Sequence, residues 1–384
     1  MIQIQNNQKY FISCPRGLEN ITAQNISRFC HHIKINKGGV SFTGDLKSLY
    51  DVNLNSRTGM FVLLELFKFR SKDINELYSK IYNYSWGEII LPQDTFSIKV
   101  NSRSNNFRNS NFLMLKIKDA IVDRIRKDKG NRPYISKNEP NYSIVVVNYQ
   151  NEFKIYLNSS GASLNKRGYR NKIHKASLNE SLAAGLIMLT GWDGEQALYD
   201  PMCGSGTIPL EAALIGFNIP PGIFRKKFAF QIWNNYDETL WYSVLKNAKD
   251  RIRKSNLDIF GYDILQANIS LAKVSAERIN LHKNIEFDQL DIFSFSPRDK
   301  QAIIITNPPY GFRVGDISKL KELYKQIGTT LKNQCCNMDA YIFSGNKELA
   351  KEIGLRSKKK IVLKNGDIEC RYLHFPIKSG KYIE

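Results

Sequence analysis

Apolar and polar positions along the first 158 residues form short segments that change between strand-like and helix-like spacing. Apolar residues in short runs predict strands, and apolar residues three or four apart predict helices. The predicted strands are 10–14, 40–42, 60–69, 96–100, 143–147 and 152–157, and the predicted helices are 17–29, 45–52, 74–82 and 111–128. In the last helix Leu113, Ile117, Ile121 and Ile125 recur at every fourth position. This half of the chain is therefore expected to be α+β.

From Ala197 onward, strand-like segments alternate with helical ones. The predicted strands are 197–199, 259–262, 285–287, 302–306 and 340–343. This alternation predicts a parallel sheet with crossover helices. Two further strands, 360–363 and 372–376, leave no room for a helix, and the turn Asn365-Gly366 between them is a strong hairpin signal. The fold class is therefore α/β, a Rossmann-like parallel sheet closed by an antiparallel hairpin.

The two halves are joined by a polar, glycine-containing and basic stretch, residues 158–176, which is the best linker candidate. A helix follows it. Ser177 and Glu180 have the spacing of a capping box, in which the hydroxyl and the carboxylate satisfy free amides at the start of a helix.

Charge adds the first functional clue. The chain has 56 Lys and Arg against 36 Asp and Glu, a formal net charge of +20. The first 170 residues hold 26 of the basic and 13 of the acidic residues. Such an excess favours polyanions such as nucleic acid as partners. A coding bias toward Lys, Asn and Ile is the alternative explanation.

Cysteines and hydropathy exclude several classes of protein. None of the six cysteines belongs to a CxxC pair, and no histidine cluster lies near them, so neither a structural zinc nor a disulfide framework is expected. No apolar run reaches the roughly 18–20 residues of a membrane span. The first ten residues have no signal-peptide pattern, and a cytoplasmic protein is expected.

The stretch from Asp200 to Thr207, which contains Gly204 and Gly206, follows the first strand of the parallel sheet and precedes a helix. Glycines let the backbone approach a ligand at the carboxyl end of a strand. A nicotinamide site would need a third glycine where Pro209 stands, and a Walker loop would need Gly-Lys-Ser/Thr. Asp200 is better suited to a cation than to a phosphate.

Two more acidic residues end strands of this sheet. Asp263 follows strand 259–262 and could accept both hydroxyls of a ribose. Asp291 follows 287–290 and could accept from an exocyclic amine. Alone, each could be a solvated strand end, but three such acids after a glycine turn indicate a nucleotide-like ligand.

The sequence Asn307-Pro308-Pro309-Tyr310 ends the most apolar strand. Successive prolines stiffen the chain, so the Asn307 side-chain oxygen and a proline carbonyl become two rigid acceptors. They suit the two hydrogens of a planar NH2 group and would turn its lone pair out of conjugation. Tyr310 offers a ring for a base extracted from its stack. A merely rigid loop is the alternative interpretation.

Together these stretches resemble the class I S-adenosylmethionine-dependent RNA methyltransferases with a THUMP domain, of the bacterial rRNA guanine-N2 type. The resemblance also rests on residues 11–19, 50–58, 165–170, 180–184 and 220–233, and on Gly311 and Arg313. It implies an N-terminal ferredoxin-like unit (1–58), a THUMP RNA-binding domain (59–158), a linker (159–176) and a methyltransferase domain (177–384).

The resemblance also implies roles for individual residues. S-adenosylmethionine is expected to be held by Asp200, Gly204, Gly206, Thr207, Asp263 and Asp291. Catalysis is assigned to Asn307, Pro308 and Tyr310. Substrate contacts are expected from basic residues: Arg103, Arg108, Lys116, Arg124, Arg126, Arg167, Arg170 and Arg313. The expected partner is RNA, with rRNA favoured over tRNA, and neither a metal, a membrane nor an obligate protein partner is expected.

Other functions stay open at this point. They are N2 methylation of tRNA guanine, N6 methylation of DNA adenine, N5 methylation of a protein glutamine, and a non-catalytic RNA-binding role in ribosome assembly. The basic N-terminal half disfavours the protein substrate. Cys203 and Cys336 suggest the thiolate route of carbon-5 methylation, but neither lies in the Asn-Pro-Pro-Tyr context.

Overall fold

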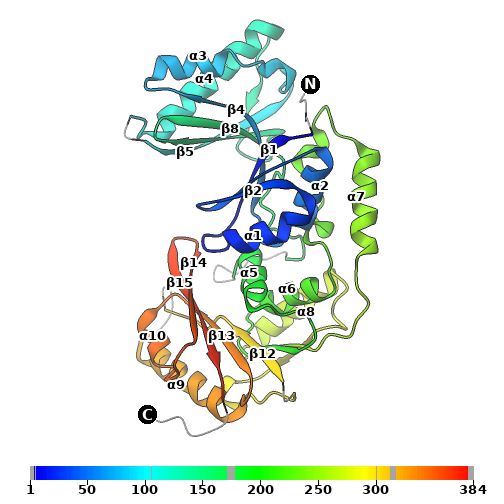
Figure 1. The fold of residues 1–384 in the computed structure, drawn as a ribbon, viewed down its shortest axis with the longest axis vertical. Coiled ribbons are helices and arrows are strands. Elements are labelled where there is room, and N and C mark those ends of the chain that lie inside the picture. The colour runs from blue at the N-terminus through cyan, green and yellow to red at the C-terminus, as the bar shows by residue number, and fades with distance from the viewer. Residues whose placement is uncertain are drawn as a thin grey trace.

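The computed structural model describes residues 4, 6–104, 106–170, 178–299, 301–311 and 317–378. These described residues form two sheets, one in each half of an elongated molecule (Figure 1). The N-terminal sheet lies in the upper half of the view, and the C-terminal sheet lies in the lower half. One hydrophobic cluster packs on the N-terminal sheet, and two others cover opposite faces of the C-terminal sheet.

The N-terminal sheet has the strand order β2-β3-β1-β4-β8-β7-β5-β6. Its strands are β1 (Gln8–Ser13), β2 (His31–Asn36), β3 (Gly39–Gly44), β4 (Phe61–Arg70), β5 (Thr95–Arg103), β6 (Tyr134–Ile135), β7 (Tyr142–Tyr149) and β8 (Glu152–Asn158). Strand β4 pairs with both β1 and β8, so the sheet continues across residue 58, where we expect a boundary. The sequence analysis did not predict strands β2 and β6, which are short and largely exposed.

Side-chain caps fix the helices of this half. Asp45, Asp73 and Asn109 each accept a hydrogen bond from a backbone amide of the helix they precede, and Gly130 ends the longest helix with a φ of +79°. The helical segments are α1 (Glu19–Ile26), η1 (Ser27–Phe29), α2 (Leu46–Asn55), α3 (Ile74–Tyr82), η2 (Trp86–Glu88) and α4 (Ser110–Lys129). In Figure 1, α3 and α4 lie on the upper side of the N-terminal sheet.

The C-terminal sheet has the order β11-β10-β9-β12-β13-β15-β14. Its strands are β9 (Ala197–Asp200), β10 (Ile259–Asp263), β11 (Glu286–Gln289), β12 (Ala302–Thr306), β13 (Asp339–Ser344), β14 (Lys359–Asn365) and β15 (Ile368–Pro376). Strands β9 to β13 pair in parallel, whereas β15 pairs antiparallel with β13 and β14. The predicted parallel sheet closed by a hairpin is confirmed.

Helices cover both faces of this sheet. Helices α5, α6 and α8 pack on one face, and α9 and α10 pack on the other. The helical segments are α5 (Glu180–Thr190), α6 (Thr207–Gly216), η3 (Pro221–Phe224), η4 (Ala229–Ile232), α7 (Glu238–Asp250), α8 (Gln266–Arg278), η5 (Ile292–Ser294), α9 (Ile317–Gln334) and α10 (Lys347–Lys351). Among the described residues, no helix has the length and apolar character that crossing a membrane requires.

Helix α5 corrects one local expectation. Its cap is Asn179, whose side chain accepts from the Leu182 amide at 3.2 Å. Ser177, the other half of the predicted capping box, lies outside the described residues. The Glu180 carboxylate forms an ion pair with Arg170 at 3.3 Å instead of serving such a box.

The stretch 158–176, which the sequence suggests as a linker, is packed where the structure describes it. Ser159, Ser160, Leu164, Arg167 and Tyr169 are all at most 2% exposed. The two halves also share a core. Phe230 and Trp241, from the C-terminal half, pack in the cluster on the N-terminal sheet. The domain boundaries given above therefore stay a proposal about folding units.

Candidate active site

Two of the acids singled out in the sequence lie with Asn307 at one edge of the C-terminal sheet. Asp200 ends β9, Asp263 ends β10, and Asn307 directly follows β12. Strand β9 lies between β10 and β12, so the strand order reverses there: the chain runs outward from β9 to β10 and β11 and then returns to the other side of β9 as β12. Open α/β sheets bind ligands at the carboxyl ends of their strands at such a switch point.

The glycine turn after β9 has two glycines with different roles. Gly206 has a φ of +78° and caps α6, and a Cβ there would lie 2.8 Å from the Ala272 Cβ and 2.9 Å from the Phe287 ring. Gly204 has a φ of +55°, yet a Cβ there would meet no protein atom within 4 Å. Gly206 therefore serves close packing, whereas Gly204 borders open space that a ligand can fill.

Asp263 is oriented by its own surroundings. One carboxylate oxygen accepts from the Gly204 amide at 3.0 Å, and the other accepts from the Leu265 amide at 2.9 Å and from Asn268 Nδ2 at 3.0 Å. A carboxylate offers about four acceptor positions, so capacity remains for a hydroxyl group. Asp291 caps η5 by accepting from the Phe293 amide at 3.1 Å.

Asp200 is only 1% exposed, and its Oδ1 accepts from the Met202 amide at 3.2 Å. Burial raises the pKa of this carboxyl to about 7. The neighbouring Cys203 is also buried, and burial raises the pKa of its thiol. A protonated thiol is a poor nucleophile, which argues against Cys203 in a covalent route.

Asn307 and Tyr310 extend the site from β12. The Asn307 Oδ1 atom is buried and has no hydrogen-bond partner among the described residues. The Tyr310 ring packs against Gly345, where a Cβ would lie 2.8 Å from the ring. Its hydroxyl accepts from Asn365 Nδ2 at 2.8 Å. The Tyr310 ring is thus held between the ends of β13 and β14. Pro308 is buried.

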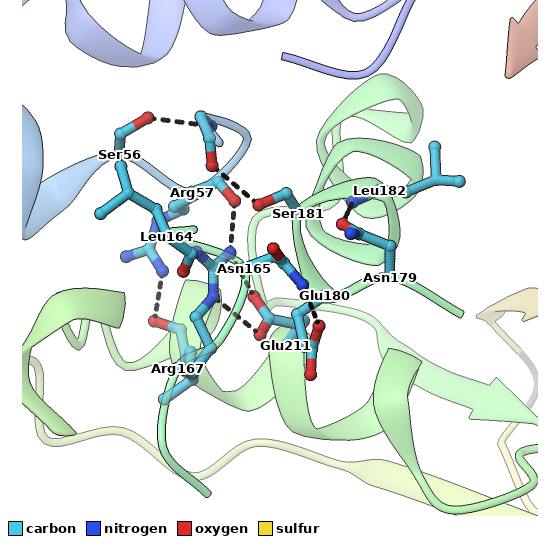
Figure 2. A network of polar contacts seen from close by, with 12 residues as sticks. Ser56, Arg57, Leu164, Asn165, Arg167, Asn179, Glu180, Ser181, Leu182 and Glu211 are labelled. Carbon is cyan, nitrogen blue, oxygen red and sulfur yellow. Dashed lines mark hydrogen bonds and ion pairs between the residues drawn. The ribbon is translucent and has the colours of Figure 1, made fainter. Parts of the chain in front are cut away.

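Two of the predicted substrate-binding arginines are structural, which corrects the expectation. Arg167 is 1% exposed; it pairs with Glu211 of α6 at 3.2 Å and also donates to the backbone oxygens of Leu164 and Arg57 (Figure 2). Tyr169 donates to the same Glu211 carboxylate at 2.9 Å. A guanidinium buried and paired in this way cannot contact RNA.

Arg170 is also held by interactions within the protein. Its guanidinium pairs with Glu180, donates to the Leu178 carbonyl oxygen and contacts the Thr207 hydroxyl, with 6% of its side chain exposed. Thr207, expected in the turn before the helix, is instead the first residue of α6, and its hydroxyl faces Arg170. Arg313 lies outside the described residues.

The remaining basic candidates lie on β5, on α4 and between them. Arg103, Arg108 and Arg126 are exposed, and Lys116 is half-buried. Arg124 is less available, since it pairs with Asp128 at 2.7 Å and donates to the Tyr82 carbonyl oxygen at 3.1 Å. Their contact with RNA stays a prediction.

Sequence reasoning missed Asn365 and Glu211. Asn365 reads as a turn residue, and nothing local indicates that its amide reaches Tyr310. Glu211 did leave a signal, because it is the one charged residue in the otherwise apolar sequence of α6. A lone charge in a buried helix indicates a buried partner.

Family models match three consecutive parts of the chain. An RMKL-like methyltransferase domain matches residues 167–374, a THUMP domain matches 71–158, and an RlmL ferredoxin-like domain matches 9–63. A candidate RNA methyltransferase of Synechocystis, slr0064, is 36% identical over 370 residues, which cover 96% of each chain. The ribosomal RNA large subunit methyltransferase K/L of Shewanella baltica is 33% identical over 369 residues, which cover 94% of this chain and 52% of that protein. The chain thus spans about half the length of that K/L relative.

Two solved structures have a similar fold over almost the whole length of this chain. SMU.472, a candidate methyltransferase complexed with SAH, has a TM-score of 0.88 and 25% identity and covers 98% of this chain and 100% of that one. A candidate N6-adenine-specific DNA methylase from Listeria monocytogenes has a TM-score of 0.87 and 28% identity and covers 96% of both chains. From the extent of these matches, the chain belongs to the RMKL-like methyltransferase family, with an RlmL-type ferredoxin-like domain and a THUMP domain preceding its methyltransferase domain.

Proposed function

We propose that this chain methylates the exocyclic N2 amine of guanosine in RNA, and that the RNA is large-subunit ribosomal RNA. One observation carries the choice of an amine: the buried, unpartnered Oδ1 of Asn307 at the carboxyl end of β12. Buried polar atoms are nearly always hydrogen-bonded, so an unpartnered acceptor here favours a ligand that brings an N–H group.

S-adenosylmethionine is the methyl donor, since the structural relative SMU.472 was solved with SAH, its demethylated product. The strand ends described above fit this group. We assign its ribose hydroxyls to Asp263, its adenine amine to Asp291, and its methionine end to Asp200 and the turn Gly204–Thr207. The open space beside Gly204 supports this assignment. When bound, the cofactor supplies an electrophilic methyl group on a sulfonium.

The chain's own residues would position the amine. Asn307 Oδ1 and the Pro308 carbonyl oxygen accept its two hydrogens, which frees the nitrogen lone pair from conjugation with the base. Tyr310, held by Asn365 and Gly345, presents a ring for a base taken out of its stack. Positioning of this kind can supply about 7–11 kcal/mol of a barrier.

The choice of RNA rests on charge and on relatives. The N-terminal half carries most of the +20 net charge, and it includes the THUMP match. The Synechocystis relative is named for RNA methylation, and the Shewanella relative is named for ribosomal RNA.

Nucleoside mass spectrometry tests the proposal. Ribosomal RNA from a strain lacking this protein should lose N2-methylguanosine at one position or more, and tRNA should be unchanged. The purified chain, supplied with an isotope-labelled methyl donor, should transfer the labelled methyl group to that rRNA. Loss from tRNA alone, or from neither RNA, would contradict the proposed substrate.

N6 methylation of adenine is the second candidate, favoured by the description of the Listeria structure. The same Asn-Pro-Pro-Tyr segment suits either amine. Incubation of the chain with labelled donor and either total RNA or genomic DNA separates the two. Label in N6-methyladenine of DNA would replace our proposal with this one.

A further inference from the structure

Within the part of the chain that the structure describes, no helix packs on one face of the N-terminal sheet (Figure 1). On the covered face, Phe69, Phe153 and Ile155 pack in the same cluster as Leu77 of α3 and Ile117 of α4. Side chains alternate between the faces of a strand. Five basic residues on β4, β5 and β8 therefore lie on the opposite face, the basic sheet face: Lys68, Arg70, Lys99, Arg103 and Lys154.

Strand register brings these cations together. Lys68 lies directly opposite Lys154 in the β4–β8 pair. In the next row of the same face, Arg70 is opposite Glu152, Glu152 is opposite Tyr149, and Tyr149 is opposite Arg103. Neighbouring strands are about 4.8 Å apart, so the charges form one continuous surface.

Two acids share this face without neutralising it. Glu152 pairs with Lys154 at 3.8 Å, and both side chains are more than one-third exposed, so the pair is weak. Glu65 is opposite Tyr156. Like charges directly opposite on adjacent strands destabilise a sheet. The facing pair Lys68 and Lys154 therefore lowers the stability of the sheet, and a bound anion would relieve this repulsion.

An aromatic side chain lies within this surface. Tyr149 is 60% exposed and is next to Arg103 across the β7–β5 pair. Exposed aromatic rings among cations are the usual means of binding unpaired nucleotides, because every base has a face that can stack.

The orientation of the sheet separates this face from the basic surface of α4. Helices α3 and α4 lie on the side of the sheet that is turned away from the methyltransferase half (Figure 1). The side of the sheet that carries the basic sheet face is turned toward the hairpin β14–β15 (Figure 1). In this hairpin Asn365 donates to Tyr310 of the candidate active site. An RNA bound there can extend toward Asn307 without passing around the sheet.

We infer that the basic sheet face, rather than α4, is the surface on which the phosphate backbone of the RNA substrate docks, with Tyr149 stacking on an unpaired base. This inference rests on the proposed RNA substrate. It assigns Arg103 to the docking surface and gives the helix face no part in binding.

Two matched variants of the full chain test it. The first is Lys68→Gln/Lys99→Gln/Lys154→Gln on the basic sheet face. The second is Lys80→Gln/Lys127→Gln/Lys129→Gln, which removes three exposed lysines from α3 and α4. Binding of deproteinised ribosomal RNA is measured by filter binding over a range of salt concentrations.

The sheet variant should bind about 10–100-fold more weakly than wild type at 0.1 M salt, and its salt slope should fall by about two, as expected for three lost phosphate contacts. The helix variant should bind as wild type does. Equal losses in both variants, a loss only in the helix variant, or no loss in either would overturn the inference. Wild-type protein that binds no RNA would contradict the proposed function itself.

A single substitution adds a readout that loss of folding cannot imitate. Lys68→Glu places opposite charges across the β4–β8 pair, so the melting temperature should rise while RNA affinity falls. A lower melting temperature, or unchanged RNA affinity, would count against the docking role.

Discussion

Asp200 has a property, its protonation state, that the sequence pattern around it does not predict. Its place after a strand and before two glycines indicates a ligand-binding acid, but its protonation depends on burial by neighbours that are distant in sequence. Asp263 is similar, because its hydrogen bond to the Gly204 amide joins two strand ends that no local pattern relates. Residue types and strand ends could thus be predicted, whereas protonation and orientation could not.

The raised pKa of Asp200 predicts opposite pH effects on stability and on cofactor affinity. The folded chain holds a proton at Asp200 that the unfolded chain releases between the pKa values of 3.8 and about 7. Stability from this group is therefore complete below pH 3.8 and is lost as the pH rises through about 7. Affinity for the cationic methyl donor should instead increase, by on the order of tenfold between pH 5.5 and 7.5, as the carboxylate forms.

Calorimetric binding and thermal melting at several pH values check this expectation. Asp200→Asn keeps the shape and removes the titration, so it serves as the control and should remove both pH effects. If the variant and the wild type show the same pH dependence, another group is responsible.

Asn307 should matter for turnover more than for binding. Its Oδ1 is proposed to accept from the guanine amine, a contact that strengthens as the nitrogen becomes tetrahedral and partly positive. Asn307→Ala should therefore lower kcat by about 10²–10³ and leave donor and RNA affinity within a few-fold. Asn307→Asp keeps an acceptor and should retain part of the activity. Near-normal turnover of the Ala variant would mean that the segment is only a rigid loop.

At the scale of elements, the hairpin β14–β15 was predicted from Asn365-Gly366, but the turn lies one residue further on. Asn365 pairs with Ile368, so Gly366 and Asp367 form the two-residue turn, and Gly366 has a φ of +61°. Asn365 is thereby free to bind Tyr310. The hairpin is also braced by the N-terminal half, since the Lys364 amide donates to the Arg16 carbonyl oxygen at 3.2 Å. Local turn chemistry predicts the hairpin, whereas its contacts depend on tertiary packing.

Asn365 should act through Tyr310. Asn365→Ala removes the donor to the Tyr310 hydroxyl, an interaction worth about 0.5–1.5 kcal/mol, so single-turnover methyl transfer should slow about 2–12-fold. In a Tyr310→Phe background, which lacks the acceptor, the same change should have no further effect. Additive losses in this double-mutant cycle would show that Asn365 contributes by another route.

At the scale of the whole molecule, the sequence predicts two separate halves, whereas in the structure the two halves share a hydrophobic core. The order of the strands in the C-terminal half was predicted from local periodicity, whereas β2 and β6 were missed and helices α7 to α10 were not placed individually. Periodicity cannot show that residues 220–250 of the C-terminal half complete the N-terminal core, because that contact spans nearly 200 positions. Tyr50 stacks on Phe230 at 4.6 Å between ring centroids, and the Trp241 ring meets Tyr50 edge-on at 5.7 Å.

Trp241 should therefore stabilise the N-terminal half although it lies on α7. It is 6% exposed and packs against Phe228 and Phe230 as well as Tyr50. Trp241→Ala should lower the free energy of unfolding by about 3–5 kcal/mol, the usual cost of emptying a large core site. Tyr242→Ala, at a 60% exposed neighbour, is the matched control and should change it by no more than about 0.5 kcal/mol. Hydrogen exchange should show lost protection in α2 and β4, and loss confined to α7 would mean that the two halves fold independently.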